Sequence, residues 1–240
     1  MSQAAPKEYE QLRVSGLHAF YGESHILHGI DLVVNRGELV TLLGRNGAGR
    51  STTLKAIMNM VGRRTGSIMI NGEETMACAP HHIARLGVGY CPEHRGIFSE
   101  LNVQENLTLP PVVRSGGMGL DEIYSMFPNL YERRFSQGTK LSGGEQQMLA
   151  MARILRTGAN MLLLDEITEG LAPVIVEKLG EVLLKLKEKG LTIVLVEQNF
   201  HFAAPLADRH YVMEHGQIAE EISADELEAK QSLLNDYLGV

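Results

Sequence analysis

The sequence predicts an α/β fold in which a parallel sheet is covered by helices on both faces. Three short, continuous apolar runs carry this prediction, because each is typical of a strand buried on both sides: residues 38–43, 161–164 and 191–196. Between the last two runs, Pro173 stands at an expected first helical position, and apolar residues recur at helical spacing up to Leu186. Strand–helix–strand order with buried strands indicates parallel pairing.

An antiparallel sheet is expected to accompany the parallel one near the N-terminus. Residues 11–35 and 64–72 contain short alternating segments around the dipeptides Tyr21-Gly22 and Asn71-Gly72. Asn-Gly is a strong hairpin signal, because both residues tolerate positive φ angles. We therefore predict an N-terminal antiparallel β subdomain beside the parallel core.

The middle and the end of the chain are expected to be helical. Residues 94–140 are less apolar and contain clusters of Pro and Gly, with a helical pattern near residues 120–127. We predict an α-helical subdomain at about 94–158, inserted into a single domain that spans residues 1–240. Ser223 and Glu226 have the spacing of a capping box, so residues 223–238 are predicted to form a helical tail.

The composition predicts a soluble, acidic, cytosolic protein. Hydrophobic residues make up 44% of the 240, and the net charge of −7 argues against nucleic acid, where binding to phosphates needs clustered cations. No apolar run approaches the ~18 residues of a membrane-spanning helix, and the first ten residues lack the apolar core of a secretory signal. Cys78 and Cys91 are the only cysteines, which excludes a disulfide framework.

A glycine-rich loop after the first buried strand has the spacing of the P-loop, G-x-x-x-x-G-K-[ST]. Its glycines let backbone N–H groups curl around an anion, and the helix from about Ser51 directs its N-terminal dipole at the same anion. Ser51 is placed to offer its hydroxyl to Mg²⁺. We predict that ATP is bound by nine loop residues: Gly44, Arg45, Asn46, Gly47, Ala48, Gly49, Arg50, Ser51 and Thr52.

Arg50 occupies the position of the motif's lysine. Arginine presents a wide planar fork, whereas lysine presents a compact charge on a flexible stem. Both are cations, so we expect ATP binding to persist while the positioning of the γ-phosphate changes.

Two carboxylates, Asp165 and Glu166, end the second buried strand. In parallel α/β sheets ligands lie beyond the carboxyl ends of the strands, so both side chains are expected beside the phosphate loop. Asp165 is predicted to hold Mg²⁺, since hard cations favour carboxylate oxygens. Glu166 is predicted to orient and deprotonate the attacking water.

A second helix start is predicted after Leu141, where Ser142 and Glu145 have capping-box spacing. Gly143 and Gly144 leave the first N–H groups of that helix accessible, which is typical of an anion site. With the phosphate loop and the acidic pair, the run LSGGEQQ at residues 141–147 resembles the signature of the ATP-binding cassette (ABC) ATPases. The resemblance covers about residues 11–240.

The resemblance implies a dimer. In that family two chains sandwich two ATP molecules head to tail, so Leu141, Ser142, Gly143, Gly144 and Glu145 are expected to complete the site of a second ABC ATPase chain, identical or related. Gly170-Leu171-Ala172-Pro173 matches the D-loop region that links the two sites. Tyr21 matches the aromatic residue that stacks on adenine, and a surface tyrosine in a turn is the alternative interpretation.

One branch of the family matches best: the second ATPase subunit of high-affinity branched-chain amino acid importers. Its characteristic stretches resemble Tyr90-Cys91-Pro92-Glu93, Val196-Glu197-Gln198-Asn199 and the closing Tyr237-Leu238-Gly239-Val240. The resemblance implies a cytoplasmic subunit, peripheral on the inner face of the cell membrane, that powers uptake through two integral membrane permease subunits. A periplasmic solute-binding protein is then an indirect partner. Related importers serve urea, amides or small organic acids, so the solute stays open.

Four positions depart from the general family pattern: Arg50, Glu93, Gln198 and Ile167. Glu93 stands where a Gln usually touches Mg²⁺ and the attacking water, and Gln198 stands where a His usually contacts the γ-phosphate. The resemblance implies catalytic roles for both beside Glu166, with Glu93 also a Mg²⁺ ligand beside Ser51 and Asp165. Ile167 replaces a usual Pro.

These departures suggest a working but slow ATPase, because Gln cannot carry a proton as His does. A regulatory half-site paired with a more active second ATPase is the first alternative, and a non-transport ABC ATPase switch is the second. His201 lies three residues past Gln198 and is either a helix-face residue or a substitute for the missing His.

Overall fold

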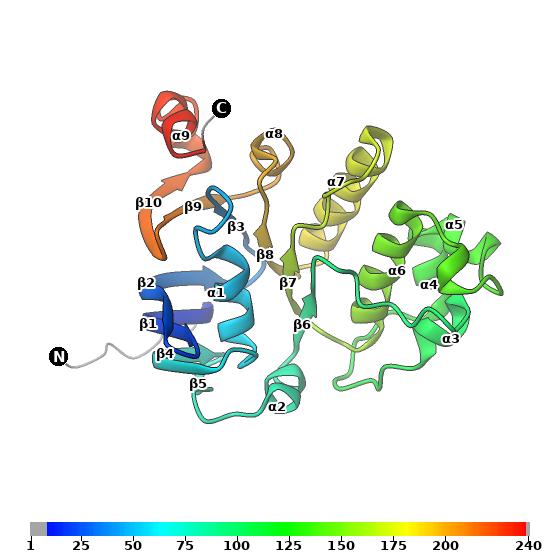
Figure 1. Cartoon of the computed structure of the whole chain (residues 1–240). Coiled ribbons are helices and arrows are strands. Elements are labelled where there is room, and N and C mark those ends of the chain that lie inside the picture. The colour runs from blue at the N-terminus through cyan, green and yellow to red at the C-terminus, as the bar shows by residue number, and fades with distance from the viewer. Residues whose placement is uncertain (1–8, 239–240) are drawn as a thin grey trace.

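The computed structural model describes residues 9–238, and a six-stranded sheet forms its centre (Figure 1). The central strand, β3 (Leu39–Leu43), pairs in parallel with two neighbours, β8 (Thr192–Val196) and β9 (Arg209–Glu214). On the far side of β8 follow β7 (Met161–Asp165) and β6 (Val88–Cys91), also parallel. β10 (Gln217–Ser223) is antiparallel to β9 at the other edge. The three predicted buried strands are thus β3, β7 and β8, and the α/β fold class is confirmed.

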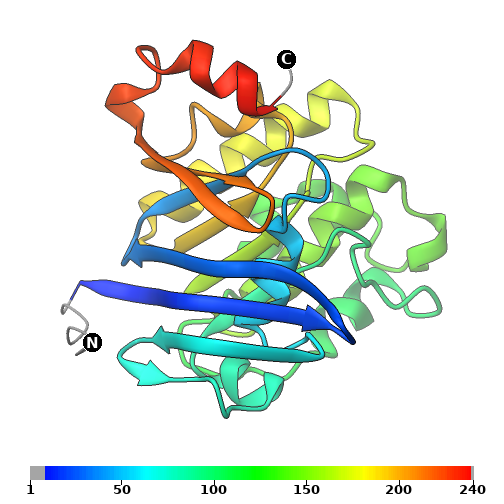
Figure 2. The same cartoon turned by 60° about the vertical axis from the view of Figure 1, so that its left-hand side comes forward.

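A four-stranded antiparallel sheet packs beside the first, in the order β2-β1-β4-β5 (Figure 2). Its strands are β1 (Glu10–Tyr21), β2 (Ser24–Asn35), β4 (Arg63–Ile70) and β5 (Glu73–Glu74). Both predicted turn dipeptides join neighbouring strands, and Gly22, Asn71 and Gly72 all have positive φ angles there. The prediction of an antiparallel sheet near the N-terminus is confirmed.

Two hydrophobic cores lie on opposite faces of the parallel sheet. Along β3, Leu39 and Leu43 belong to one core, whereas Val40 and Leu42 belong to the other, and all four are fully buried. The second core also contains α1 (Arg50–Ile57) and the inner face of the antiparallel sheet. The alternation explains why most positions of the buried strands are apolar, on both faces.

The first core packs the remaining large helices against the sheet. These are α6 (Gly143–Arg156) and α7 (Pro173–Glu188), which begins at the predicted proline. The shorter helices α3 (Val103–Thr108), α4 (Leu120–Met126) and α5 (Pro128–Glu132) pack against α6, around the fully buried Phe127. They lie on the side of the molecule away from β1, β2 and β4 (Figure 1).

The remaining elements are α2 (Pro80–Arg85), α8 (Phe200–Ala203), α9 (Gln231–Leu238) and two 3₁₀ turns, Gly138–Lys140 and Ala224–Glu226. The capping box of Ser223 and Glu226 forms, but it caps only the 3₁₀ turn, and the α-helix starts later, at Gln231. The predicted continuous tail is therefore wrong at its start. Gly239 and Val240, which belong to the closing stretch of the resemblance, lie outside the described residues. Within residues 9–238, no helix is both long and apolar enough to cross a membrane.

Candidate functional site

The loop between β3 and α1 is shaped by glycines that other residues cannot replace. Gly44 has a φ of 150°, and a Cβ on it would lie 2.4 Å from the carbonyl oxygen of Met213. Gly49 has a φ of 105°, and its Cβ would lie 2.8 Å from a methyl of Leu27. The loop therefore folds as the P-loop spacing predicts, with the N-terminus of α1 at its end.

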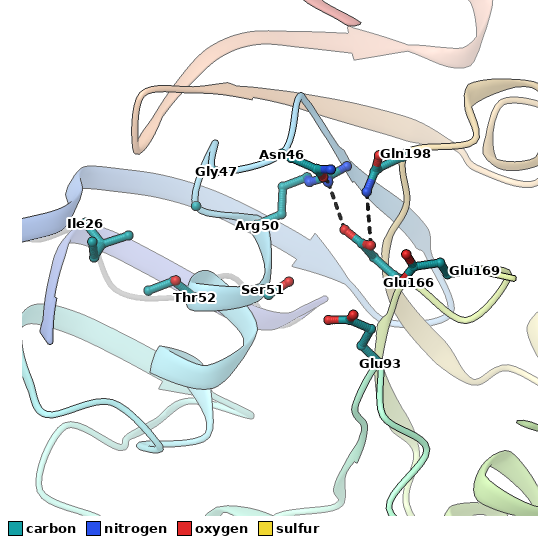
Figure 3. Close-up of a pocket in the computed structure, with 11 residues that line it drawn as sticks. Ile26, Asn46, Gly47, Arg50, Ser51, Thr52, Glu93, Glu166, Glu169 and Gln198 are labelled. Carbon is teal, nitrogen blue, oxygen red and sulfur yellow. Dashed lines mark hydrogen bonds and ion pairs between the residues drawn. The ribbon is translucent and has the colours of Figure 1, made fainter.

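The loop opens onto a pocket of about 430 Å³ (Figure 3). Its walls come from the loop and α1, from the segments after β6, β7 and β8, and from β2. The lining residues are Ile26, Asn46, Gly47, Gly49, Arg50, Ser51, Thr52, Glu93, Glu166, Glu169 and Gln198. The predicted residues Glu93, Glu166 and Gln198, far apart in sequence, thus meet the phosphate loop in one cavity.

Arg50 is buried, with 4% of its surface exposed, and its guanidinium bridges three segments. Nη1 donates to the carbonyl of Glu197 at 2.8 Å, and Nη2 donates to Asn46 Oδ1 at 3.2 Å. Nη2 also forms an ion pair with Glu166 Oε1 at 2.8 Å. The planar fork of arginine makes this three-way contact possible, because its donors lie on separate nitrogen atoms. Lysine has a single nitrogen and does not reproduce the contact.

Glu166 is therefore held from two sides in this structure. Gln198 Nε2 donates to its Oε2 at 3.1 Å, while Arg50 binds Oε1 (Figure 3). Burial raises the pKa of Glu166, and the charge of Arg50 and the Gln198 hydrogen bond oppose that rise. A carboxylate with a raised pKa inside a phosphate pocket has the properties of a general base.

Asp165 lies at the carboxyl end of β7 and is 1% exposed. Ser51 Oγ donates to its Oδ1 at 2.7 Å, and the Tyr90 hydroxyl donates to its Oδ2 at 3.0 Å. Burial raises the pKa of Tyr90, which keeps its hydroxyl protonated as a donor. Sequence reasoning gave Tyr90 no role, because its strand was not predicted, and only the fold places β6 beside β7.

The oxygen atoms of this corner suit Mg²⁺. A serine hydroxyl and a carboxylate lie in contact at Ser51 and Asp165, and Glu93 faces the same pocket. These are the hard oxygen donors that Mg²⁺ selects. Among residues 9–238, however, no three His, Cys, Asp or Glu side chains are grouped closely enough to hold a metal alone.

The signature residues lie elsewhere in the chain, at the start of α6. Ser142 and Glu145 form the predicted capping box, with Glu145 N donating to Ser142 Oγ at 3.3 Å and Ser142 N donating to Glu145 Oε2 at 2.7 Å. A Cβ on Gly144 would lie 2.8 Å from Ile175, so α6 and α7 approach closely there. Leu141, Ser142, Gly143, Gly144 and Glu145 are all absent from the pocket lining.

Two further residues are placed outside the pocket. Tyr21 ends β1 with 41% of its surface exposed and does not line the pocket, whereas Ile26 on β2 does. His201 lies on α8 (Phe200–Ala203), lines a separate groove beside α7 and is absent from the lining of the pocket that holds Glu166. Ile26 and Glu169 carried no sequence signal for this pocket.

A phosphate loop, a buried acidic strand end and a polar pocket between them define a P-loop nucleotide-binding protein. The model of the ABC transporter family matches residues 27–169, which include the phosphate loop, the signature and the acidic pair. The chain belongs to the ABC transporter family and is its ATP-hydrolysing cassette.

Curated relatives align along nearly the whole chain. The high-affinity branched-chain amino acid transport ATP-binding protein BraG of Pseudomonas aeruginosa is 39% identical, over 92% of this chain and 96% of its own. The probable branched-chain amino acid transport ATP-binding protein LivF of Archaeoglobus fulgidus is 37% identical, over 90% and 93%. The lipopolysaccharide export system ATP-binding protein LptB of Haemophilus influenzae is 30% identical, over 95% and 97%.

Solved ABC cassettes share the fold. The dimeric post-hydrolysis state of the cassette MJ0796, bound to ADP and Pi, superposes with a TM-score of 0.79 and 25% identity, covering 89% of this chain and 98% of that one. That cassette is thus a dimer that holds nucleotide.

Proposed function

We propose that this chain is the ATPase subunit of an ABC importer, powering uptake of branched-chain amino acids or a related small solute through separate membrane subunits. The 39% identity to BraG over 92% of the chain is the observation that carries the proposal. Relatives as similar as LptB serve export, so an export partner is the second candidate. Urea, amides and small organic acids are alternative solutes for an importer.

The pocket residues take the following proposed roles. The loop of residues 44–52 binds the ATP phosphates through its backbone N–H groups and Arg50. Ser51, Asp165 and Glu93 hold Mg²⁺, which supplies charge neutralisation when bound. Tyr90 orients Asp165. The exposed ring of Tyr21 stacks on the adenine ring. This role requires the nucleotide to extend beyond the phosphate pocket.

Hydrolysis in this proposal needs Glu166 to change partners. Glu166 takes the proton of the attacking water, and Gln198 aligns that water or the γ-phosphate through its amide. In the structure Gln198 and Arg50 each donate a hydrogen bond to the Glu166 carboxylate. When the γ-phosphate attracts Arg50, the carboxylate of Glu166 becomes free to act. A slow basal rate follows, which also fits a regulatory half-site.

The proposal places the site at a dimer interface. The pocket lacks the signature residues 142–144, so a second ABC ATPase chain contributes them over the γ-phosphate. Closure of the two chains then drives the permease subunits from the inner face of the membrane, and the solute-binding protein acts only through those subunits.

Uptake by cells tests the proposal. In a strain that lacks this chain, we expect uptake of radiolabelled leucine, isoleucine or valine to fall, and the wild-type chain to restore it. Glu166→Gln serves as the matched control that binds nucleotide but does not hydrolyse it. Normal uptake in the deletion strain contradicts the proposal that the solute is a branched-chain amino acid. Recovery of the tagged chain with ribosomes or DNA instead of membrane subunits contradicts a role in transport.

A further inference from the structure

Glu197 is a buried charged residue for which the proposed mechanism has no role. It directly follows β8, is 2% exposed and precedes Gln198 in the chain. Both of its carboxylate oxygens accept hydrogen bonds from one residue, Thr168: the backbone N–H at 3.1 Å and the hydroxyl at 2.9 Å. The backbone carbonyl of Glu197 accepts from Arg50 at 2.8 Å. One residue thus connects α1, the end of β8 and the loop after β7.

Thr168 belongs to the loop that carries the base. Glu166 has a φ of +48°, in the left-handed region that residues with a side chain rarely adopt. Such a conformation persists only where the surroundings hold it in place. The Glu166 N–H donates to Val196 O at 2.9 Å, and two residues later Thr168 is fixed by Glu197. The strained residue therefore lies between two attachments to the same end of β8.

We propose that Glu197 is a positioning residue, which holds Glu166 in its left-handed conformation by clamping Thr168. The inference rests on the proposed role of Glu166 as the base. Because the clamp also fixes the segment that leads to residues 170–173, it joins the Gln198 segment to the expected dimer-facing loop. Loss of the clamp misplaces the base and therefore lowers the turnover number. The affinity of the phosphate loop for nucleotide stays unchanged.

The charge of the clamp makes it sensitive to pH. Burial raises the pKa of Glu197 to about 7, opposed by the two Thr168 hydrogen bonds and by Arg50 on α1, while Glu166 on the facing loop adds to the rise. The ionised carboxylate accepts both hydrogen bonds from Thr168. In the protonated acid one of the two oxygens is a hydroxyl, which is a poorer acceptor. The clamp is therefore complete above pH 7 and weakens as the pH falls below it.

Four variants of the full chain test the clamp by steady-state ATP hydrolysis and by fluorescent nucleotide titration. Thr168→Val removes the hydroxyl donor but keeps the shape, and we expect about a tenfold lower kcat with the nucleotide Kd within about twofold. Thr168→Ser keeps the donor and restores the rate. Thr75→Val is the matched control, because it removes a buried threonine hydroxyl that donates to Ile68 O at 2.9 Å. Thr75 directly follows β5 in the antiparallel sheet and does not line the phosphate pocket.

Glu197→Gln supplies the pH readout. Its amide oxygen accepts from the Thr168 N–H and its amide nitrogen donates to the hydroxyl, so the clamp stays without a titrating group. We expect the ratio of wild-type to variant kcat to fall between pH 8 and pH 6. A ratio that is constant over this range contradicts the role of the Glu197 charge.

The outcomes separate this inference from the proposed function. A wild-type rate equal to that of Glu166→Gln overturns the proposed function, and the clamp with it. Hydrolysis that depends on Glu166 but is unchanged by Thr168→Val overturns the clamp alone. A slowing shared by Thr75→Val, or a Kd that weakens as much as kcat falls, also overturns it, because both indicate general loss of structure.

Discussion

At the scale of single residues, Arg50 shows how one substitution changes the chemistry of a phosphate loop. Its sequence position predicts a cation beside the phosphates, and the structure adds a second property, the ion pair with Glu166 at 2.8 Å. The two residues are 116 positions apart in sequence. They meet only because the carboxyl ends of β3 and β7 lie at the same edge of the sheet, so no local sequence pattern predicts the contact. The same is true of Tyr90 with Asp165 and of Glu197 with Thr168.

We predict that Arg50→Lys raises kcat by about threefold or more, with ATP affinity changed by less than about threefold. Lysine keeps the positive charge but cannot bind Glu166, Asn46 and the Glu197 carbonyl together, so the base is released more readily. The measurement is phosphate release at saturating ATP. Arg50→Ala is the control and loses affinity. A slower Arg50→Lys variant contradicts a restraining role of the ion pair.

At the scale of elements, sequence patterns located the parts of the site but not their partners. The apolar runs became β3, β7 and β8, and the capping box of Ser142 and Glu145 formed because its hydrogen bonds are local. The tail was predicted as one helix because the box of Ser223 and Glu226 is equally local, yet it caps a single 3₁₀ turn. Tyr21 and Ile26 lie on one hairpin, and only the fold shows which of them lines the pocket.

Strand β9 carries a buried histidine whose titration affects stability. His210 is fully buried, its Nδ1 lies 2.7 Å from Thr41 Oγ1, and burial lowers its pKa to about 4. The unfolded chain, with a His pKa of about 6.5, binds the proton first as the pH falls. The contribution to stability is therefore complete above pH 6.5 and is lost as the pH falls towards 4.

We predict that this histidine removes about 2 kcal/mol of the free energy of unfolding between pH 7.5 and pH 5. Urea unfolding at the two pH values measures it, and His210→Gln provides the comparison, since it lacks the titrating group. The wild-type chain should lose more stability than the variant over this range. Equal losses refute the prediction.

At the scale of the whole molecule, the phosphate pocket and the signature residues lie in separate places on one chain. The phosphate pocket lies at the carboxyl ends of β3, β7 and β8, while the signature starts α6 and contributes nothing to that pocket. The sequence resemblance implied a head-to-tail dimer, and the dimeric MJ0796 cassette has the same fold. The geometry of one chain is consistent with sites completed only by two.

We predict that ATP makes the Glu166→Gln chain dimeric, and that adding Ser142→Arg keeps it monomeric without reducing ATP affinity. The arginine introduces bulk and charge at the N-terminus of α6, where the proposal places the partner's γ-phosphate. Sedimentation with and without ATP measures the change. Ser142→Ala controls for the lost cap, which is worth about 1 kcal/mol. Dimers of the Ser142→Arg form contradict the role in trans.

We propose above all that this chain hydrolyses ATP with Glu166 as the base, in a pocket built on the loop of residues 44–52. The most direct test compares phosphate release by the wild-type chain and by Glu166→Gln at saturating ATP and Mg²⁺. We predict a kcat at least about a hundredfold lower in the variant, with nucleotide still bound. Equal rates in the two proteins would contradict the account.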